Sequence, residues 1–493
     1  MKMSAGAGSI PFLLSSTEAT QDSGEFNVEF QKIGTSLKVK PCLLYHLHKR
    51  KEAATWREWG GLKTQGDVEK EVNNINRELK DLVLRADFPI KMLPLTQVNS
   101  DNHAKAVADC DCDVILLYGA GSAGDRVYKQ NRLDIIANSG KSVIMFLRHK
   151  SGPIYLWYEI AHPKLLRSAT DEYLHKYMNI DDIVVDEYNH VIWRLRSLFG
   201  LKNIKGTKLV AINGMGGWGE GGEHAPRVAK EVWNLDVETV GIKEVAERMD
   251  KKLSDQAMVE EISTEVHQYL NQKNIVSVNT KEEFIMRAFI LKDIFKDLMK
   301  ESDAVGVTVR GCMGIGGDVG TTPCLSLSLI NDEGLMAFCE SDFVVIPSGV
   351  LLRYISGKPV FLNDPCYPYD GKTTCAHCSA PTRMDGKRFE PTHIYTHCES
   401  DYGAAPKVEF KKGQIVTNII PDFNSKKWIG FKGQITDHPF YDICRSQFDC
   451  TIEGDWKKLL KDMRGFHWMT AYGDYLKEME YAVRKAGIEW ERV

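Results

Sequence analysis

The sequence lacks the features that would assign it to several common classes of protein. No apolar run approaches the ~20 residues that a membrane span requires, so we expect no membrane partner. The 63 Lys and Arg residues are offset by 67 Asp and Glu residues, which leaves no basic excess for binding nucleic acid. Twelve cysteines among 493 residues are too dilute for the disulfide framework of a small secreted module. We therefore expect reduced thiols and a cytoplasmic location.

The length and the ordinary apolar fraction indicate a globular chain of several domains. At roughly 150 residues per domain, 493 residues correspond to two to four domains. Residues 1–24 are rich in Ser, Ala, Gly and Thr, and we expect a flexible tail there. Their one apolar run is broken by Pro11 and is too short for a signal peptide.

Short apolar runs alternate with amphipathic segments, a pattern typical of α/β domains with parallel sheets. We expect two open, Rossmann-like domains, at residues 25–206 and 207–370. The expected strands include 41–46, 114–118, 142–147, 208–212, 304–309, 335–339 and 359–362. After about residue 385 polar residues alternate with apolar ones, which predicts an antiparallel sheet or a small β-barrel, and we expect a C-terminal domain of this kind at residues 371–493 with a terminal helix.

Two glycine-rich turns follow predicted strands. The first, 119–124, matches a dinucleotide fingerprint, but the next strand ends at Leu147-Arg148-His149, without the acid that would hold a ribose. We interpret it as a tight turn. The second, 214–219, lacks the Gly-Lys-Ser/Thr ending of a phosphate loop. It is either a plain turn or a loop that contacts substrate at the carboxyl end of a strand.

Cysteine and histidine cluster at Cys375-Ala376-His377-Cys378 and at His397-Cys398. A structural zinc site needs two ligand pairs at set spacings. Adjacent residues on a strand point to opposite faces, so His397 and Cys398 would hardly reach one ion. The pattern disfavours structural zinc but leaves single ligands possible.

Glu340 and Asp342 follow the predicted strand 335–339. We expect this strand to carry both side chains on one face at its carboxyl end, because they are two residues apart. Such a pair of carboxylates is costly unless it is solvated, paired or bound to a cation. The sequence therefore predicts either a hard divalent-ion site or a solvated acidic loop.

Four segments between residues 300 and 493 stand out together. They are Phe338-Cys339-Glu340-Ser341-Asp342, strand 359–362 with Asn363-Asp364, His377-Cys378-Ser379-Ala380-Pro381 and Gly465-Phe466-His467-Trp468. They resemble motifs of the L-fucose isomerase / L-arabinose isomerase superfamily, most closely its divergent fucose-isomerase-like branch. The resemblance implies two α/β domains and a C-terminal β-barrel. It also implies a cytoplasmic homo-oligomer, a trimer or hexamer, with an active site completed by a neighbouring subunit.

The resemblance further implies a metal site. The family's metal carboxylate falls on Asp342, with Glu340 beside it as a ligand or catalytic base, and its histidine ligands fall on His377 and His467. Two histidines with one or two carboxylates suit Mn²⁺, or another divalent cation such as Mg²⁺.

One position departs from the family pattern. The first catalytic carboxylate is expected near the start of the helix before residue 340, where this chain has Pro323-Cys324. The nearest acid is Asp318. Cys324 is either a soft ligand or base, or a buried structural cysteine.

The resemblance implies an aldose–ketose isomerase that acts on a small carbohydrate. Arg57, Trp59 and Arg148 follow predicted strands and are candidate substrate residues, as is Trp468 within the late motif. The missing carboxylate leaves two alternatives: a metal-dependent sugar hydrolase, lyase or epimerase, and an inactive sugar-binding protein.

Overall fold

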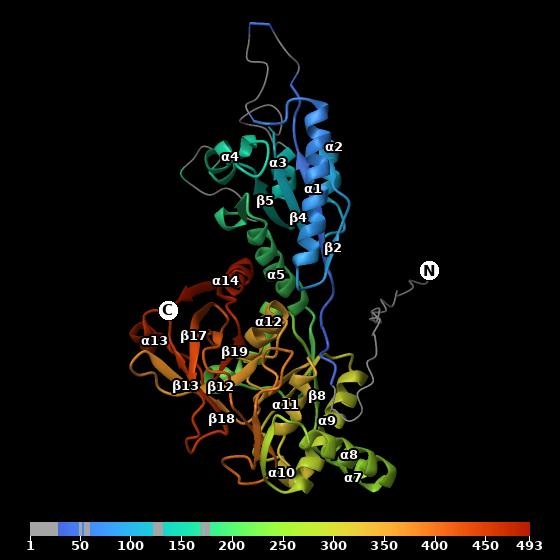
Figure 1. The fold of residues 1–493 in the computed structure, drawn as a ribbon, viewed down its shortest axis with the longest axis vertical. Helices are drawn as coiled ribbons and strands as arrows, with labels where there is room; N and C mark the ends of the chain where they lie inside the picture. Colours follow the sequence, from blue (N-terminus) through green and yellow to red (C-terminus); the bar gives the residue numbers. More distant parts are fainter. Residues whose placement is uncertain (1–27, 49–51, 54–59, 122–131, 168–170, 172–177) are drawn as a thin grey trace.

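The structure is a computed structural model that describes residues 28–48, 52–53, 60–121, 132–167, 171 and 178–493. The expected tail at 1–24, and Arg57 and Trp59, lie outside the described residues. The described chain forms two α/β domains with parallel sheets and a C-terminal β-barrel domain, which confirms the predicted fold class (Figure 1). Among these residues, no helix combines the length and apolarity needed to cross a membrane.

The N-terminal domain is built on a parallel sheet. Its strands are β1 (Leu37–Leu44), β2 (Ile90–Met92), β3 (Thr96–Val98), β4 (Val114–Gly119), β5 (Ser142–Leu147) and β6 (Ile183–Val185). Its helices are α1 (Gln65–Arg85), α2 (Asp101–Ala108), α3 (Arg132–Ala137), α4 (Leu156–Ile160) and α5 (Tyr188–Ile204). The strand order is β2-β1-β4-β5-β6, and β3 also pairs with β1. Both faces of β4 and β5 are buried, which explains their continuous apolar sequences.

The second domain has the parallel strand order β11-β10-β7-β8. Its strands are β7 (Lys208–Ile212), β8 (Asp236–Val240), β9 (Ile275–Asn279), β10 (Gly306–Val309) and β11 (Met336–Cys339). Its helices are α6 (Ala225–Trp233), α7 (Ile242–Ser254), α8 (Gln256–Leu270), α9 (Glu282–Glu301), α10 (Gly316–Val319), α11 (Cys324–Asp332) and α12 (Ile346–Ser356). Strand β9 leaves this sheet and pairs with a strand that follows it far along the chain, β14 (Thr392–Tyr395).

The C-terminal domain contains a closed antiparallel barrel. Besides β14, the strands of the domain are β12 (Phe361–Pro365), β13 (Lys372–His377), β15 (Ala405–Val408), β16 (Ile415–Ile420), β17 (Lys427–Asp437), β18 (Ser446–Thr451), β19 (Trp468–Tyr472) and β20 (Glu489–Arg492). Its helices are α13 (Trp456–Asp462) and α14 (Leu476–Lys485). The order β16-β19-β12-β13-β18-β17 is closed by pairing of β17 with β16. Closure leaves no open edge in the ring.

Two expectations about this region differ from the structure. Strand 359–362, expected in the second parallel sheet, is β12, which pairs antiparallel with β13 and β19 in the barrel. Its apolar sequence fits either kind of buried strand, so the residues alone could not place it. The predicted terminal helix is α14, and β20 follows it and pairs with β17.

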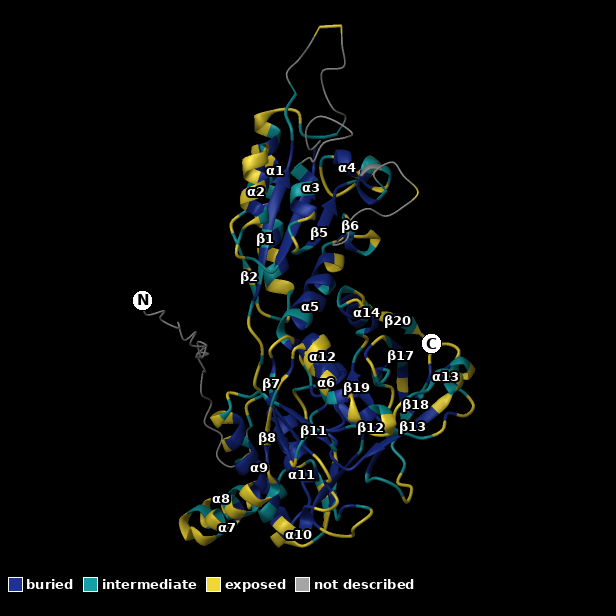
Figure 2. Ribbon diagram, turned by 180° about the vertical axis from the view of Figure 1, so that it is seen from behind, coloured by how far each residue is buried: buried dark blue, intermediate teal, exposed yellow. Residues whose placement is uncertain are grey.

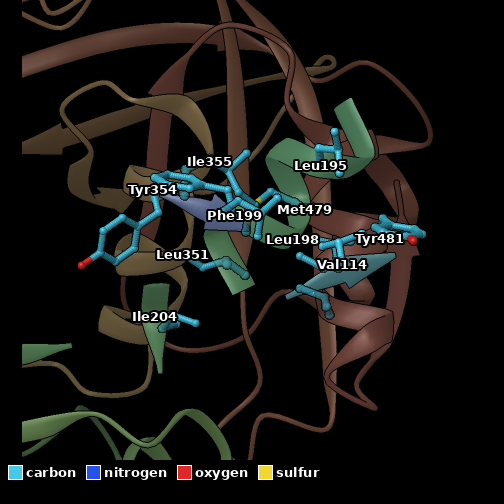
Figure 3. Close-up of a cluster of buried hydrophobic side chains, with 14 of the residues drawn as sticks. Val114, Leu195, Leu198, Phe199, Ile204, Leu351, Tyr354, Ile355, Met479 and Tyr481 are labelled. Carbon is cyan, nitrogen blue, oxygen red and sulfur yellow. The ribbon is translucent and has the colours of Figure 1, made fainter. Parts of the chain in front are cut away.

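Helix α5 packs in one apolar core that contains side chains from all three domains. Leu198 and Phe199 of α5 pack among Ile355 of α12 and Met479 of α14 (Figure 3). A Cβ at Gly200 would lie 2.5 Å from Ile355 Cγ1, so glycine allows α5 and α12 to approach closely. The buried residues in Figure 2 run continuously from the N-terminal sheet through α5 to the barrel.

Candidate metal centre

The acidic residues lie in a tight turn after β11. The strand ends at Cys339, and Glu340 (φ 63°) and Ser341 (φ 48°) both have left-handed backbone conformations. The prediction that one strand face carries Glu340 and Asp342 is therefore wrong about the backbone. The turn is held by the Ser341 backbone N–H, which donates to Thr308 Oγ1 on β10 at 3.1 Å. Such backbone geometry at an acidic site is typical of a functional turn.

The second glycine-rich turn wraps around this acidic turn. Gly216 N donates to Ser341 O at 3.2 Å, and Phe343 N donates to Gly216 O at 2.9 Å. A Cβ at Gly217 would lie 2.9 Å from Gly222 Cα and 3.1 Å from Asp342 Oδ1. Glycine is needed here because loop and carboxylate approach so closely. The loop after β7 therefore contacts the acidic turn directly.

Two histidines from the barrel domain meet Glu340. His377 is the last residue of β13, and His467 directly precedes β19. Glu340 Oε1 lies 3.6 Å from His377 Nε2, and Glu340 Oε2 lies 3.6 Å from His467 Nε2. Ligand atoms of these three residues lie within 4.8 Å of one another, so the cluster could hold a metal ion. Among the described residues, no other group of three His, Cys, Asp or Glu side chains converges in this way.

Asp342 lies behind His467 and is not part of this group of three. His467 Nδ1 and Asp342 Oδ2 are 2.7 Å apart, and both side chains are buried. Val344 N donates to Asp342 Oδ1 at 3.1 Å, which fixes the carboxylate. A carboxylate on Nδ1 selects the tautomer that leaves Nε2 free to bind a metal. Glu340, which the resemblance gave as a ligand or base, thus belongs to the converging group, whereas Asp342, which it gave as the metal carboxylate, is hydrogen-bonded to His467.

Asp364, to which the sequence analysis gave no role, is a fourth polar group at the cluster. Its Oδ1 lies 3.2 Å from His467 Nε2. This oxygen and the Nε2 atoms of His377 and His467 are all buried without a hydrogen bond of acceptable geometry. Buried polar atoms in native structures nearly always have a partner, because an unmet one costs free energy. Two imidazole nitrogens and carboxylate oxygens fit a divalent cation as that partner.

The pKa values show how strongly these groups favour opposite charges. Burial would raise the pKa of Glu340, but His377 and His467 lower it to about 2. Burial would lower the pKa of His377, but Asp364 and Glu340 raise it to about 10. Burial opposes protonation of His467 as well, yet Asp342 and Asp364 raise its pKa to about 9. The carboxylates thus attract positive charge, which a bound cation would supply.

An aromatic pair that was not predicted from the sequence lies beside the cluster. Trp218, in the glycine-rich loop, and Phe466, next to His467, stack with ring centres 4.6 Å apart. Their exposed fractions are 42% and 46%, which is unusual for large apolar side chains. Trp218 Nε1 also donates to Glu340 Oε2 at 2.7 Å. The signal available in the sequence was a tryptophan set among glycines directly after a predicted strand.

The two predicted substrate residues that the structure describes, Arg148 and Trp468, are buried and do not belong to this cluster. Arg148 is 1% exposed and pairs with Glu71 and Glu78 inside the N-terminal domain. Trp468 is 0% exposed and packs against Phe431 in the barrel core. Since neighbouring residues on a strand point to opposite faces, Trp468 turns inward where His467 turns toward Glu340.

The cysteines contribute no ligand to the converging group. Cys324, at the position of the family's first carboxylate, is buried against Cys378, and Asp318 is exposed on α10. Cys375 lies in the barrel core. Cys110 and Cys112 form a disulfide, and the ten other cysteines are free.

Comparison with known proteins adds no family assignment. No family model matches the chain, and no curated protein matches it significantly. The geometry of the cluster and the motif residues within it are therefore the features that indicate a function.

Proposed function

We propose that this protein is a metal-dependent sugar isomerase that interconverts an aldose and a ketose. The observation that carries the proposal is the convergence of Glu340, His377 and His467, whose buried Nε2 atoms make no hydrogen bond. All three belong to motifs that resemble the fucose and arabinose isomerases. We further propose Mn²⁺ as the cation, since imidazole and carboxylate ligands together suit it, with Mg²⁺ as the alternative.

The side chains divide into ligands, an orienting group and a proton carrier. Glu340, with its lowered pKa, stays ionised and serves as the anionic ligand. His377 and His467 present Nε2, and Asp342 keeps His467 in the required tautomer. A bound divalent cation would polarise the two oxygens that the sugar carries at C1 and C2.

Isomerisation must also move a proton between C2 and C1. Asp364 is suited to this role because its side chain is 26% exposed, whereas those of His467 and Asp342 are almost completely buried. It lies beside a ligand histidine and has no hydrogen-bond donor on Oδ1. Asp364 therefore supplies the second carboxylate that the chain lacks at Cys324.

The test is ketose formation by purified protein loaded with Mn²⁺ and incubated with pentoses, hexoses and deoxyhexoses. We expect a ketose from at least one aldose, and a loss of at least about 100-fold in rate for Asp364→Asn. His393→Ala is a matched control, because His393 pairs with Glu409 on a different sheet, and we expect it to keep the activity. Absence of ketose from every sugar would refute the isomerase.

A second candidate uses the same ligands for hydrolysis, elimination or epimerisation of a sugar. It is favoured by Cys324, which is buried at the position of the family's first carboxylate. NMR spectra of the same incubations distinguish it, because an epimer, a dehydrated sugar or a free aglycone would appear instead of a ketose. Stoichiometric metal with no product from any sugar would leave a sugar-binding protein.

A further inference from the structure

Glu340 accepts a hydrogen bond from one donor among the described residues, and this donor lies in the loop after β7. Trp218 Nε1 donates to Glu340 Oε2 at 2.7 Å. The other oxygen, Oε1, faces His377 Nε2 at 3.6 Å, too far for a hydrogen bond. The indole N–H therefore engages one carboxylate oxygen and leaves the other directed at the histidine.

The position of Trp218 is fixed from two sides. Its ring stacks on Phe466 with an interplanar angle of 23°, and Phe466 adjoins the ligand His467 in sequence. On the other side, Gly216 is hydrogen-bonded to Ser341 and Phe343 of the acidic turn. A side chain held in this way can orient the carboxylate of Glu340, which is 19% exposed and could otherwise rotate.

We infer that Trp218 is a positioning residue of the metal centre that acts through Glu340. By donating to Oε2, its N–H holds the carboxylate with Oε1 facing His377 Nε2 and Oε2 facing His467 Nε2, each at 3.6 Å. The inference rests on the metal site of the proposed function, but it does not depend on which reaction follows. Residues that hydrogen-bond to metal ligands are typically responsible for a 10–100-fold effect on affinity.

The decisive variant is Trp218→Phe, which removes the N–H and keeps an aromatic ring for Phe466. We expect the Kd for Mn²⁺, measured by titration calorimetry on the full chain, to rise about 10–100-fold. With Co²⁺ in place of Mn²⁺, we expect a changed visible absorption spectrum, because Glu340 then coordinates differently. The thermal unfolding temperature in the presence of a chelator should not change, since Trp218 is 42% exposed.

Two further variants separate the hydrogen bond from general effects. Phe466→Leu removes the stacking partner but keeps the indole N–H, and we expect a Kd increase of less than about tenfold. Trp456→Phe, at a half-buried tryptophan that begins α13, should leave the Kd unchanged.

The outcomes also separate this inference from the proposed function. If wild-type protein binds Mn²⁺ and forms no ketose while Trp218→Phe weakens binding, the inference stands and the isomerase fails. A wild-type Kd and an unchanged Co²⁺ spectrum for Trp218→Phe would overturn the inference even if ketose is formed. Absence of Mn²⁺ and Co²⁺ binding by wild type would overturn both.

Discussion

Two clusters of buried charge lie near the carboxyl ends of parallel strands, and they differ in how their polar atoms are satisfied. Arg148 follows β5, and its Nε, Nη1 and Nη2 atoms all donate to neighbours that include Glu71, Glu78 and Ser151. At the metal centre, the Nε2 atoms of His377 and His467 have no such partner. Burial of charge at a strand end therefore does not by itself indicate function. The more specific sign is the convergence of unmatched imidazole nitrogens with a carboxylate, whose ligand atoms lie within 4.8 Å of one another.

The largest expected effect comes from breaking the Arg148 cluster, in which every guanidinium nitrogen has a partner. Arg148→Ala leaves Glu71, which is 1% exposed, without its cation. Breaking a buried ion pair typically costs about 3–5 kcal/mol, so we expect a loss of that order in the free energy of unfolding, measured by urea denaturation. The affinity for Mn²⁺ should not change. Arg388→Ala is the control: that residue pairs with Asp385 but is 79% exposed, and its loss should cost no more than about 1 kcal/mol.

A smaller effect is expected from the orienting carboxylate of the metal centre. Asp342→Asn removes the charge beside His467 Nδ1, and we expect the Kd for Mn²⁺ to rise about 10–100-fold, or about 1.4–2.7 kcal/mol. Asp182→Asn is a matched control, because Asp182 is equally buried but bonds to Tyr481 and Lys485. We expect the control to lower stability and keep the Kd. If Asp342→Asn instead lowered stability and kept the Kd for Mn²⁺, Asp342 would stabilise the fold without contributing to metal binding.

The smallest effect concerns an acid whose hydrogen-bond partners are neutral. Asp332 accepts hydrogen bonds from Thr382 Oγ1 and Arg383 N, and burial raises the pKa of its carboxyl to about 7. Because this native pKa lies above the unfolded value, the native state binds the proton more tightly, and the contribution of Asp332 to stability falls between about pH 4 and pH 7.

The side chain introduced by Asp332→Asn has no carboxyl group that could ionise. We therefore expect the stability of the variant relative to wild type to rise by about 1 kcal/mol between about pH 4.5 and pH 5.5, because wild-type Asp332 loses part of its contribution there while the variant does not. Urea denaturation at the two pH values measures the difference. A constant difference between the proteins would show that Asp332 is already ionised throughout this range.

Much of the fold could be predicted because strands β4, β5 and β7 are short apolar runs set between amphipathic helices. The sheet to which β12 belongs could not be predicted, since a short apolar run is compatible with a strand in a parallel sheet and with a strand in a barrel. The left-handed turn at Glu340 and Ser341 was also hidden, because neither residue is a glycine.

The candidate site could be predicted only where a residue type indicates its chemistry. His377, His467 and Glu340 were identified through the motifs that carry the resemblance. Asp364 and Trp218 were missed because their roles depend on neighbours far away in the chain: Trp218 meets Glu340 across 122 residues. Arg148 was misleading, since its position after a strand is the same whether it binds a substrate or a buried glutamate.

The contact between Asp342 and His467 joins residues 125 positions apart. A polypeptide interrupted between β18 and β19 would retain Glu340 and His377, but it would lose His467, the sixth strand of the ring and the α14 side chains that pack on α5. Cation uptake would therefore report that synthesis and folding had proceeded through β19, and a truncated product would be recognised by its inability to take up the ion.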